Sequence, residues 1–87
     1  MVSQKLKVTN TQGFHMRPAG IFASAMSKYN CDIKIKFDGN DVNAKSLMNI
    51  IAACIRCGSD IEIVCSGPDE EEALTEAVNL LKSGLGE

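Results

Sequence analysis

The sequence contains no tryptophan, one tyrosine, three phenylalanines and one histidine among its 87 residues. Nucleic-acid-binding domains usually interleave aromatic side chains with a dense basic patch, and the sequence has neither feature, so we expect no nucleic-acid partner. No apolar run approaches the roughly 18 residues that span a bilayer, and the opening MVSQKLKVTN lacks the apolar stretch of a signal peptide. We therefore expect a cytoplasmic protein that does not enter a membrane.

The size and charge of the chain limit what it can do. A chain of 87 residues builds one core, so residues 1–87 are expected to form a single domain with no cofactor buried inside it. Residues 1–68 contain eight Lys or Arg against five Asp or Glu, whereas the DEEEALTE stretch that follows is acidic. A mildly basic surface of this kind favours acidic protein partners.

Three segments show the two-residue alternation of half-buried strands. Leu6 and Val8 alternate with lysines near the start, residues 32–37 read DIKIKF, and residues 60–66 read DIEIVCS. The DGN at residues 38–40 predicts a tight turn from the second of these into a short further strand. Because each strand has one apolar face, the sheet should be covered on one side and solvated on the other.

The segment after Arg17 shows the spacing of an amphipathic helix. Because proline disfavours helical geometry in the residue before it, this helix is predicted to begin at about Pro18, and it should end near residues 29–30. Apolar residues recur at intervals of three and four and mark the buried face. These residues are Ala19, Phe22, Ala23, Ala25 and Met26.

Two further helices are predicted in the second half of the chain. Ser46 precedes the apolar segment LMNIIAAC, which predicts a short helix with a serine cap that Gly58 terminates. Asp69 opens a last helix whose first turn is rich in glutamate, as the helix dipole favours. The inward positions are expected to be Ile50, Ile51 and Cys54 in the short helix, and Leu74, Ala77, Val78 and Leu81 in the last one.

The resulting order is strand, helix, strand, strand, helix, strand, helix. With one apolar face on each strand and one apolar stripe on each helix, the helices should lie together on one face of the sheet. The sequence therefore predicts an α+β open-faced β-sandwich of βαββαβα order, in which three helices cover one face of a four-stranded antiparallel sheet.

The most informative segment reads GFHMRPAG at residues 13–20, with His15 just before the helix start that Pro18 fixes. No Ser, Thr, Asp or Asn occupies positions 15–17, so the N–H groups of the first helical turn have no evident acceptor within the chain. Such groups favour an anion, and Arg17 adds a forked donor that matches phosphate oxygens. These residues predict a phosphate site beside His15.

His15 has two interpretations. A lone histidine in an arbitrary sequence is most often a polar loop residue. Imidazole is, however, a neutral nucleophile near pH 7, so His15 can attack phosphorus and form an adduct that remains reactive. Since the segment contains no evident metal site or general base, the chain would depend on partner enzymes for the rest of the reaction. The pattern favours a phosphoryl carrier over an enzyme.

The motif G-x-H-x-R-P-A, the order of elements and the chain length resemble the HPr family, the histidine phosphocarriers of the bacterial phosphotransferase system. The resemblance covers essentially the whole chain. It implies that His15 accepts a phosphoryl group on Nδ1 from phospho-enzyme I, which phosphoenolpyruvate charges, and passes it to sugar-specific IIA components. It also implies that Arg17 orients the phosphate, that Pro18 opens the helix and that the protein is a monomer. Met16 departs from the small residue that many members have there.

A second segment, Lys45-Ser46-Leu47-Met48, resembles the regulatory segment of HPr proteins from Gram-positive bacteria. Serine is among the best helix caps, so Ser46 has a structural role whatever else it does. The resemblance implies that HPr kinase/phosphorylase phosphorylates Ser46 with ATP and that the added charge weakens docking of enzyme I. It further implies that the phosphorylated form serves catabolite control protein A as a corepressor. Asn49 departs from the glycine of many members.

A docking surface for these partners is expected around the two segments. Leu47 and Met48 would ordinarily belong to the core, but the short helix has more apolar positions than one face can bury. We therefore expect both side chains to be exposed near His15, where methionine adapts to several partners. The helical spacing and the resemblance place the rim of this surface on the first helix, at Gly20, Ser24 and Ser27. Met16, beside the phosphate, is also expected to contact partners.

The cysteines leave an alternative open. Cys54 and Cys57 have C-x-x-C spacing, which is compatible with a small metal-binding or redox domain. A structural zinc site needs four ligands, and only His15, Cys31 and Cys65 remain to complete one. Cys31 and Cys65 fall in or beside strand segments, where reduced thiols pack well. A third interpretation is a regulatory paralogue that keeps the serine and lacks the histidine, and the presence of His15 argues against it.

Overall fold

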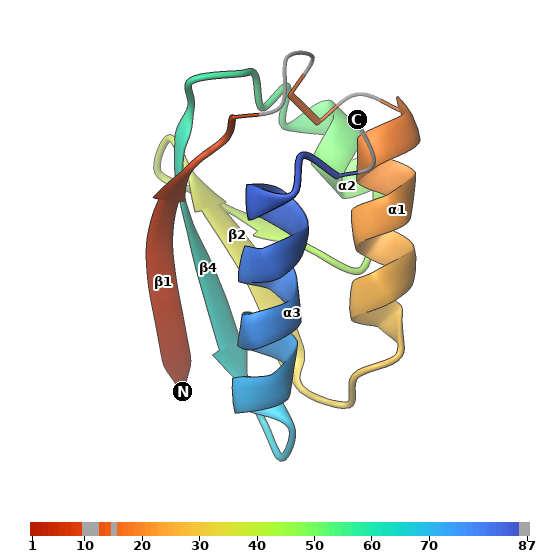
Figure 1. Cartoon of the computed structure of the whole chain (residues 1–87), viewed down its shortest axis with the longest axis vertical. Helices are drawn as coiled ribbons and strands as arrows, with labels where there is room; N and C mark the ends of the chain where they lie inside the picture. The colour runs from red at the N-terminus through yellow and green to blue at the C-terminus, as the bar shows by residue number, and fades with distance from the viewer. Residues whose placement is uncertain (10–12, 15, 86–87) are drawn as a thin grey trace.

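The described residues, 1–9, 13–14 and 16–85, form four strands and three helices in the computed structural model (Figure 1). None of the described helices combines the length and the apolar character that crossing a membrane requires. The order of the elements is the predicted one. The elements are β1 (Val2–Lys7), α1 (Met16–Ser27), β2 (Asp32–Phe37), β3 (Asn40–Asn43), α2 (Leu47–Ala52), β4 (Asp60–Ser66) and α3 (Glu70–Lys82).

The strands form one antiparallel sheet in the order β1-β4-β2-β3. In β2 and β4 the isoleucines are buried and the charged residues between them face the other side, because successive side chains of a strand alternate. Figure 1 shows α1, α2 and α3 together on one side of the sheet. The fold is therefore the α+β open-faced sandwich that the alternation predicts. Its largest fully buried side chains include Phe22, Met26, Ile35, Ile50, Ile63 and Leu81.

The turn between β2 and β3 is the tight one that DGN predicts. Phe37 pairs with Asn40 across the two strands, which leaves two residues in the loop. Asp38 has φ 51° and Gly39 has φ 80°, so both central residues adopt the left-handed conformation of a type I′ turn. This turn matches the twist of the strands and sets the register of the hairpin.

The first helix differs from its predicted bounds at both ends. It begins at Met16, two residues before Pro18, and it ends at Ser27. Proline in the first turn loses no helical hydrogen bond, because the first N–H groups have no partner within a helix. The preference of the residue before proline for extended backbone is modest, and burial of Pro18 and Ala19 outweighs it here.

The prediction for the end of α2 was wrong. The helix stops at Ala52, and Cys54 takes a left-handed conformation with φ 56°, well before Gly58. Its side chain is exposed and therefore does not belong to the predicted inward stripe. The chain turns at this point because Ile55, which is 2% exposed, must return to the core. Burying Ile55 offsets the roughly 1–2 kcal/mol that a left-handed residue other than glycine costs.

The buried stripe of α3 is also shifted from the predicted one. Ala73, Ala77 and Leu81 are fully buried, whereas Leu74 and Val78 are half-buried. Spacings of four residues link the three buried positions, and the two small alanines let the helix lie close to the sheet. Leu74 and Val78, which are larger, therefore lie beside the contact between α3 and the sheet instead of forming it.

Asp69 connects the start of α3 to the loop between α1 and β2. It occupies the N-cap position, yet its side chain makes no cap hydrogen bond. Its carboxylate instead accepts hydrogen bonds from the backbone N–H groups of Asn30, at 2.8 Å, and Cys31, at 2.9 Å. These bonds, that of Asn30 above all, hold the pKa of Asp69 below its usual value.

Asp69→Asn is expected to lower the free energy of unfolding at neutral pH, because the amide accepts these bonds less well than the carboxylate. Since the folded-state pKa is lowered, the contribution is present above about pH 4 and is lost as the pH falls through the folded pKa. Urea unfolding at several pH values checks this. Asp60→Asn is the control, because Asp60 forms only an exposed ion pair with Lys7. It should change the free energy of unfolding little. A difference between wild type and Asp69→Asn that stays constant in acid would contradict the assignment.

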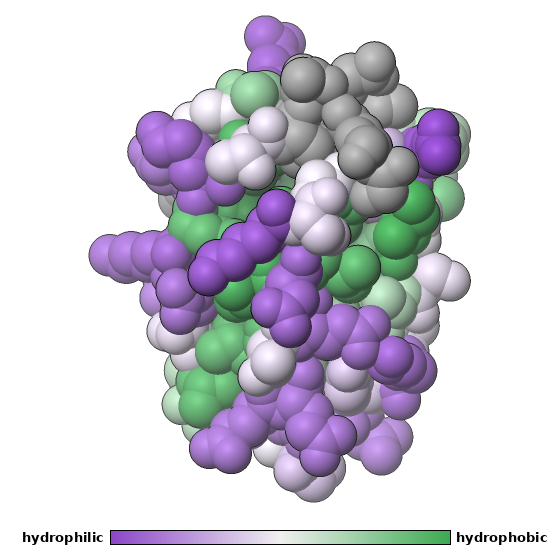
Figure 2. All heavy atoms as spheres, viewed as in Figure 1, coloured by the Kyte–Doolittle hydropathy of each residue, from purple (hydrophilic) through white to green (hydrophobic). Residues whose placement is uncertain are grey.

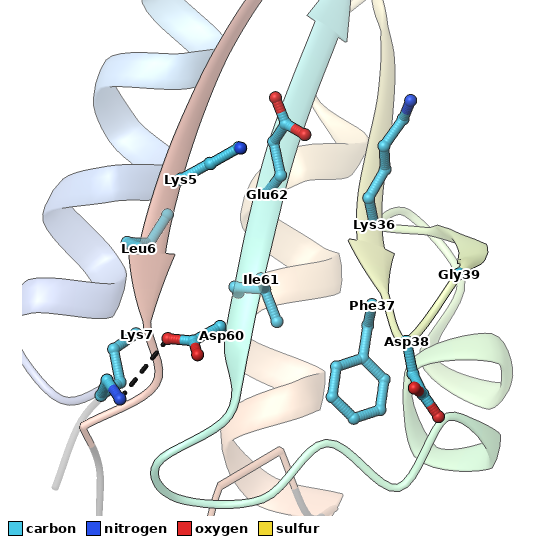
Figure 3. Close-up of a pocket in the computed structure, with 10 residues that line it drawn as sticks. All are labelled: Lys5, Leu6, Lys7, Lys36, Phe37, Asp38, Gly39, Asp60, Ile61 and Glu62. Atoms are coloured by element: carbon cyan, nitrogen blue, oxygen red, sulfur yellow. Dashed lines mark ion pairs between the residues drawn. The ribbon is translucent and has the colours of Figure 1, made fainter.

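A hollow of about 500 Å³ lies where β1 and β2 end and β4 begins. Figure 3 views this region from the side of the sheet opposite the helices, with Lys5, Glu62 and Lys36 abreast on three neighbouring strands. The dashed line marks the ion pair of Lys7 with Asp60 at 3.5 Å. Charges of opposite sign alternate here, so this face is solvated, as the strand pattern predicts.

Candidate functional site

The segment before α1 is anchored in the core. Phe14 is buried, packs edge-on against Phe22 with 5.4 Å between the ring centroids, and donates its backbone N–H to the Ile55 carbonyl at 2.9 Å. Gly13 has φ 61°, and a Cβ built there would lie 2.5 Å from the Ile55 oxygen. Only glycine fits this close approach. His15, which follows directly, lies outside the described residues.

Two further backbone hydrogen bonds join the end of β1 to the loop before β4. Val8 donates its N–H to the Ser59 carbonyl at 2.9 Å and accepts a hydrogen bond from the Gly58 N–H at 2.7 Å. The end of β1 and the loop that enters β4 are therefore joined. Residues 55–59 therefore contact both the end of β1 and Phe14, which precedes α1.

The start of α1 presents a cation to solvent. Pro18 is buried and fixes the first turn to the core, while Arg17 and Met16 are exposed. The first turn contains no acidic residue, and no carboxylate of the described residues lies within ion-pair distance of Arg17. Arg17 thus lies in the first turn, at the positive end of a 12-residue helix. This arrangement favours binding of an anion such as a phosphoryl group.

Ser46 caps α2, as predicted. Its Oγ accepts the backbone N–H of Asn49 at 3.3 Å and also the side-chain Nδ2 of Asn49 at 2.8 Å. The second bond was not foreseen, although an asparagine three residues after a serine cap is within reach of it. Lys45 donates its ammonium group to the Tyr29 carbonyl at 2.6 Å, which ties the segment before Ser46 to the chain just after α1.

The predicted docking residues lie on two helices that pack against each other, α1 and α2. Met16 and Met48 are 63% and 73% exposed, so the expected exposure of Met48 is confirmed. The expected exposure of Leu47 was wrong, because this side chain is half-buried against the core. Figure 2 shows hydrophilic residues over α3 in the middle of this face, with hydrophobic ones on both sides of them, toward β1 and over α1. On the rim, Ser24 and Ser27 are exposed and Gly20 is half-buried. The hydroxyl of Ser27 is engaged, since it donates to the Ala23 carbonyl at 2.7 Å.

The cysteines fall into two pairs with different surroundings. Cys31 and Cys65 are buried, and burial raises the pKa of the Cys31 thiol to about 11 and also raises that of Cys65. Cys54 and Cys57 are exposed free thiols. Within residues 1–9, 13–14 and 16–85, no three His, Cys, Asp or Glu side chains are grouped as metal ligands. The described structure therefore gives the C-x-x-C pair no further ligand.

Comparison with known sequences identifies the family. A family model described as the PTS HPr component phosphorylation site matches residues 2–83. The phosphocarrier protein HPr of Treponema pallidum (strain Nichols) is 38% identical over 87 residues, which are 100% of this chain and 99% of that protein. The HPr-like protein Crh of Bacillus subtilis (strain 168) is 35% identical over 74 residues, which are 85% of this chain and 87% of Crh.

Solved structures agree with this assignment. HPr-C-His from Thermoanaerobacter tengcongensis matches with a TM-score of 0.96 and 36% identity, covering 100% of this chain and 98% of that one. An HPr dimer from the same organism matches with a TM-score of 0.80 and 36% identity over the whole of both chains. Sequence and structure thus lead to one family, and the chain belongs to the HPr family of phosphocarrier proteins.

Proposed function

We propose that the chain accepts a phosphoryl group on His15 from phospho-enzyme I and passes it to sugar-specific IIA components. The observation that carries this proposal is the start of α1, where the exposed Arg17 has no carboxylate partner among the described residues and directly follows the segment that contains the chain's only histidine. A cation at the positive end of a helix favours an incoming phosphate at this point.

In the transfer, the chain itself supplies only the nucleophile and the groups that orient the phosphate. Nδ1 of a neutral imidazole at His15 forms a bond to phosphorus while the bond between phosphorus and enzyme I breaks, and a IIA component later takes the group in the same way. Arg17 orients the phosphate oxygens, and Pro18 holds the helix start to the core. The helix end and the arginine each contribute roughly 0.3–2 kcal/mol, enough to orient the group without trapping it.

The partners dock on the surface formed by the exposed parts of α1 and α2. Met16 and Met48 supply adaptable apolar contacts, with Gly20, Ser24 and Ser27 as the rim and Leu47 partly accessible. A carrier must leave one partner to reach the next, so the complexes are small and short-lived. We take residues 1–87 as one domain that acts as a monomer in the cytoplasm.

The test is phosphoryl uptake from phosphoenolpyruvate. The chain is incubated with enzyme I, magnesium and phosphoenolpyruvate, and its intact mass is measured before and after mild acid. One phosphoryl group is expected, and acid should remove it, because a nitrogen–phosphorus bond is acid-labile and a serine ester is not. If no adduct forms with an enzyme I that phosphorylates another HPr protein, the carrier role is refuted, and the regulatory-paralogue and metal-binding interpretations come forward.

Ser46 is proposed as the regulatory site, modified by HPr kinase/phosphorylase with ATP. It lies half-buried at the start of α2, next to the exposed Met48 of the docking surface. A phosphate there adds about two negative charges to a surface that must meet acidic partners, so docking of enzyme I weakens. The same charge suits a new partner, which in this family is catabolite control protein A.

Ser46→Asp is expected to raise the KM of the chain for enzyme I about tenfold, which corresponds to about 1.4 kcal/mol, with little change in stability. Aspartate caps a helix as well as serine does, but it adds a negative charge beside Met48. Ser46→Asn is the matched control, because asparagine also caps and is neutral, and its KM should be that of wild type. Steady-state transfer assays and thermal unfolding measure both effects. Equal KM values for the two variants would count against a regulatory effect of charge.

A further inference from the structure

The hydroxyl of Ser46 is held by a neighbour to which the proposed regulation gives no part. Asn49 donates two hydrogen bonds to Ser46 Oγ, from its backbone N–H at 3.3 Å and from its side-chain Nδ2 at 2.8 Å. The first bond is the ordinary contact of a serine cap, whereas the second exists only because residue 49 is an asparagine. A hydroxyl oxygen has two lone pairs, so both are occupied.

The local geometry explains why the side chain of Asn49 turns to the hydroxyl. In a capping box, a longer side chain at this position reaches back to the backbone N–H of the cap residue. Here the Ser46 N–H already donates to the Asn43 carbonyl at 3.1 Å. Among the described residues no atom accepts a hydrogen bond from the Ser46 hydroxyl, so its proton remains open to a base from outside. The fold therefore restrains the oxygen lone pairs and leaves the proton free.

We propose that Asn49 is a positioning residue that slows phosphorylation of Ser46, an inference that rests on the proposed kinase reaction. In that reaction a lone pair of Ser46 Oγ attacks the γ-phosphorus of ATP. The bond from this phosphorus to the oxygen shared with the β-phosphate breaks, ADP leaves, and the hydroxyl proton passes to a base of the kinase. The oxygen cannot attack while both lone pairs accept hydrogen bonds, so one donor must first withdraw.

The side-chain amide is the donor that can withdraw without disturbing the fold. Asn49 is exposed and lines a hollow of about 270 Å³ between α2 and the turn of the β2–β3 hairpin, which Asn40 also lines. The hollow leaves room for the amide to rotate away from Ser46. The backbone N–H of Asn49 is released only if the first turn of α2 opens. Removing the side-chain donor should therefore change the rate of phosphorylation and leave the helix in place.

Asn49→Ala is expected to raise the kcat for phosphorylation of Ser46 by HPr kinase/phosphorylase and ATP about two- to tenfold, the change that matches one hydrogen bond of ordinary net strength. The KM for the chain should stay the same, since the substitution acts on the reacting oxygen. Alanine favours helix and keeps the backbone cap, which circular dichroism and thermal unfolding check. Asn40→Ala is the matched control: it changes the same residue type at the same hollow, without contact to Ser46, and should leave kcat unchanged.

Asn49→Leu separates the hydrogen bond from the bulk of the side chain. Leucine has a similar size and no donor, so it should react as fast as the alanine variant. If the leucine variant is as slow as wild type, the bulk of the side chain, and not its hydrogen bond, restrains Ser46. If a substitution changes only the KM, Asn49 is a docking contact for the kinase. Either result overturns the inference. Equal kcat values in all chains overturn it while Ser46 phosphorylation stands. No phosphate on any chain, from a kinase active on another HPr protein, removes both proposals.

Discussion

Replacing His15 by alanine is expected to abolish acid-labile phosphoryl uptake from phosphoenolpyruvate through enzyme I. His15 is the only histidine in the sequence, and alanine offers no nitrogen to bond with phosphorus. Phosphate esters of serine survive mild acid, so acid treatment separates them from a phosphohistidine. The measurement is the intact mass of both chains from the same enzyme I mixture, before and after acid. An acid-labile adduct that persists on the variant would contradict the assignment of His15.

The variant should remain folded, so a loss of uptake would be a loss of chemistry. Phe14 before the site is held by its bond to the Ile55 carbonyl and its contact with Phe22, and Pro18 after it is buried. Equal melting temperatures for both chains check this. Arg17→Lys is a graded control, because it keeps the charge and loses the fork. Its uptake should reach completion about 10- to 100-fold more slowly, which corresponds to the loss of about one charge-assisted hydrogen bond.

The sheet and its tight turn could be predicted because the information is local. Alternation in DIKIKF and DIEIVCS assigns one face of each strand to the core, and the structure buries Ile33, Ile35, Ile61 and Ile63 accordingly. Asp38 and Gly39 suit the left-handed turn by their own conformational preferences. Neither inference needs knowledge of residues far away in the chain.

The helix ends were predicted less well because tertiary contacts decide them. Gly58 is a better helix terminator than Cys54 by intrinsic preference, yet α2 stops before Cys54 so that Ile55 can enter the core. At α1, the preference of residues before proline favoured a start at Pro18, and burial of the first turn moved the start to Met16. In each case core packing outweighed a local preference of about 1 kcal/mol.

At the candidate site, too, local features could be predicted from the sequence, whereas contacts between distant residues could not. The exposure of Met48 and the cap at Ser46 could be predicted, because each depends on residues within one helical turn. The bonds from Asp69 to the loop after α1 join residues 38 or 39 positions apart, and no periodicity marks them. The close approach of Gly13 to the Ile55 backbone also joins residues far apart in sequence. Gly13 was part of the sequence motif, but only the fold shows why this position must be a glycine.

Gly13→Ala is expected to lower the free energy of unfolding by about 2–5 kcal/mol. Its φ of 61° is costly for any residue with a Cβ, and the added atom would lie 2.5 Å from the Ile55 oxygen and 2.7 Å from Arg56 Cα. Conformational strain contributes about 1–2 kcal/mol, and forced movement of a packed backbone about 1–3 kcal/mol. Urea unfolding measures the sum. Because Gly13 and Phe14 lead directly to His15, phosphoryl uptake should also slow at temperatures where the variant is folded.

Two other glycines separate the contributions to this loss. Gly58 has φ 89° with no atom within 4 Å of an added Cβ, so Gly58→Ala reports the strain alone, about 1–2 kcal/mol. Gly20 lies in α1 with open space around it, and Gly20→Ala should stabilise the chain by about 0.5–1 kcal/mol. If the Gly13 and Gly58 variants lose the same free energy of unfolding, the close approach of Gly13 to Ile55 adds nothing to the loss. A clearly larger loss at Gly13 would establish that residues 55–56 hold the segment leading into His15.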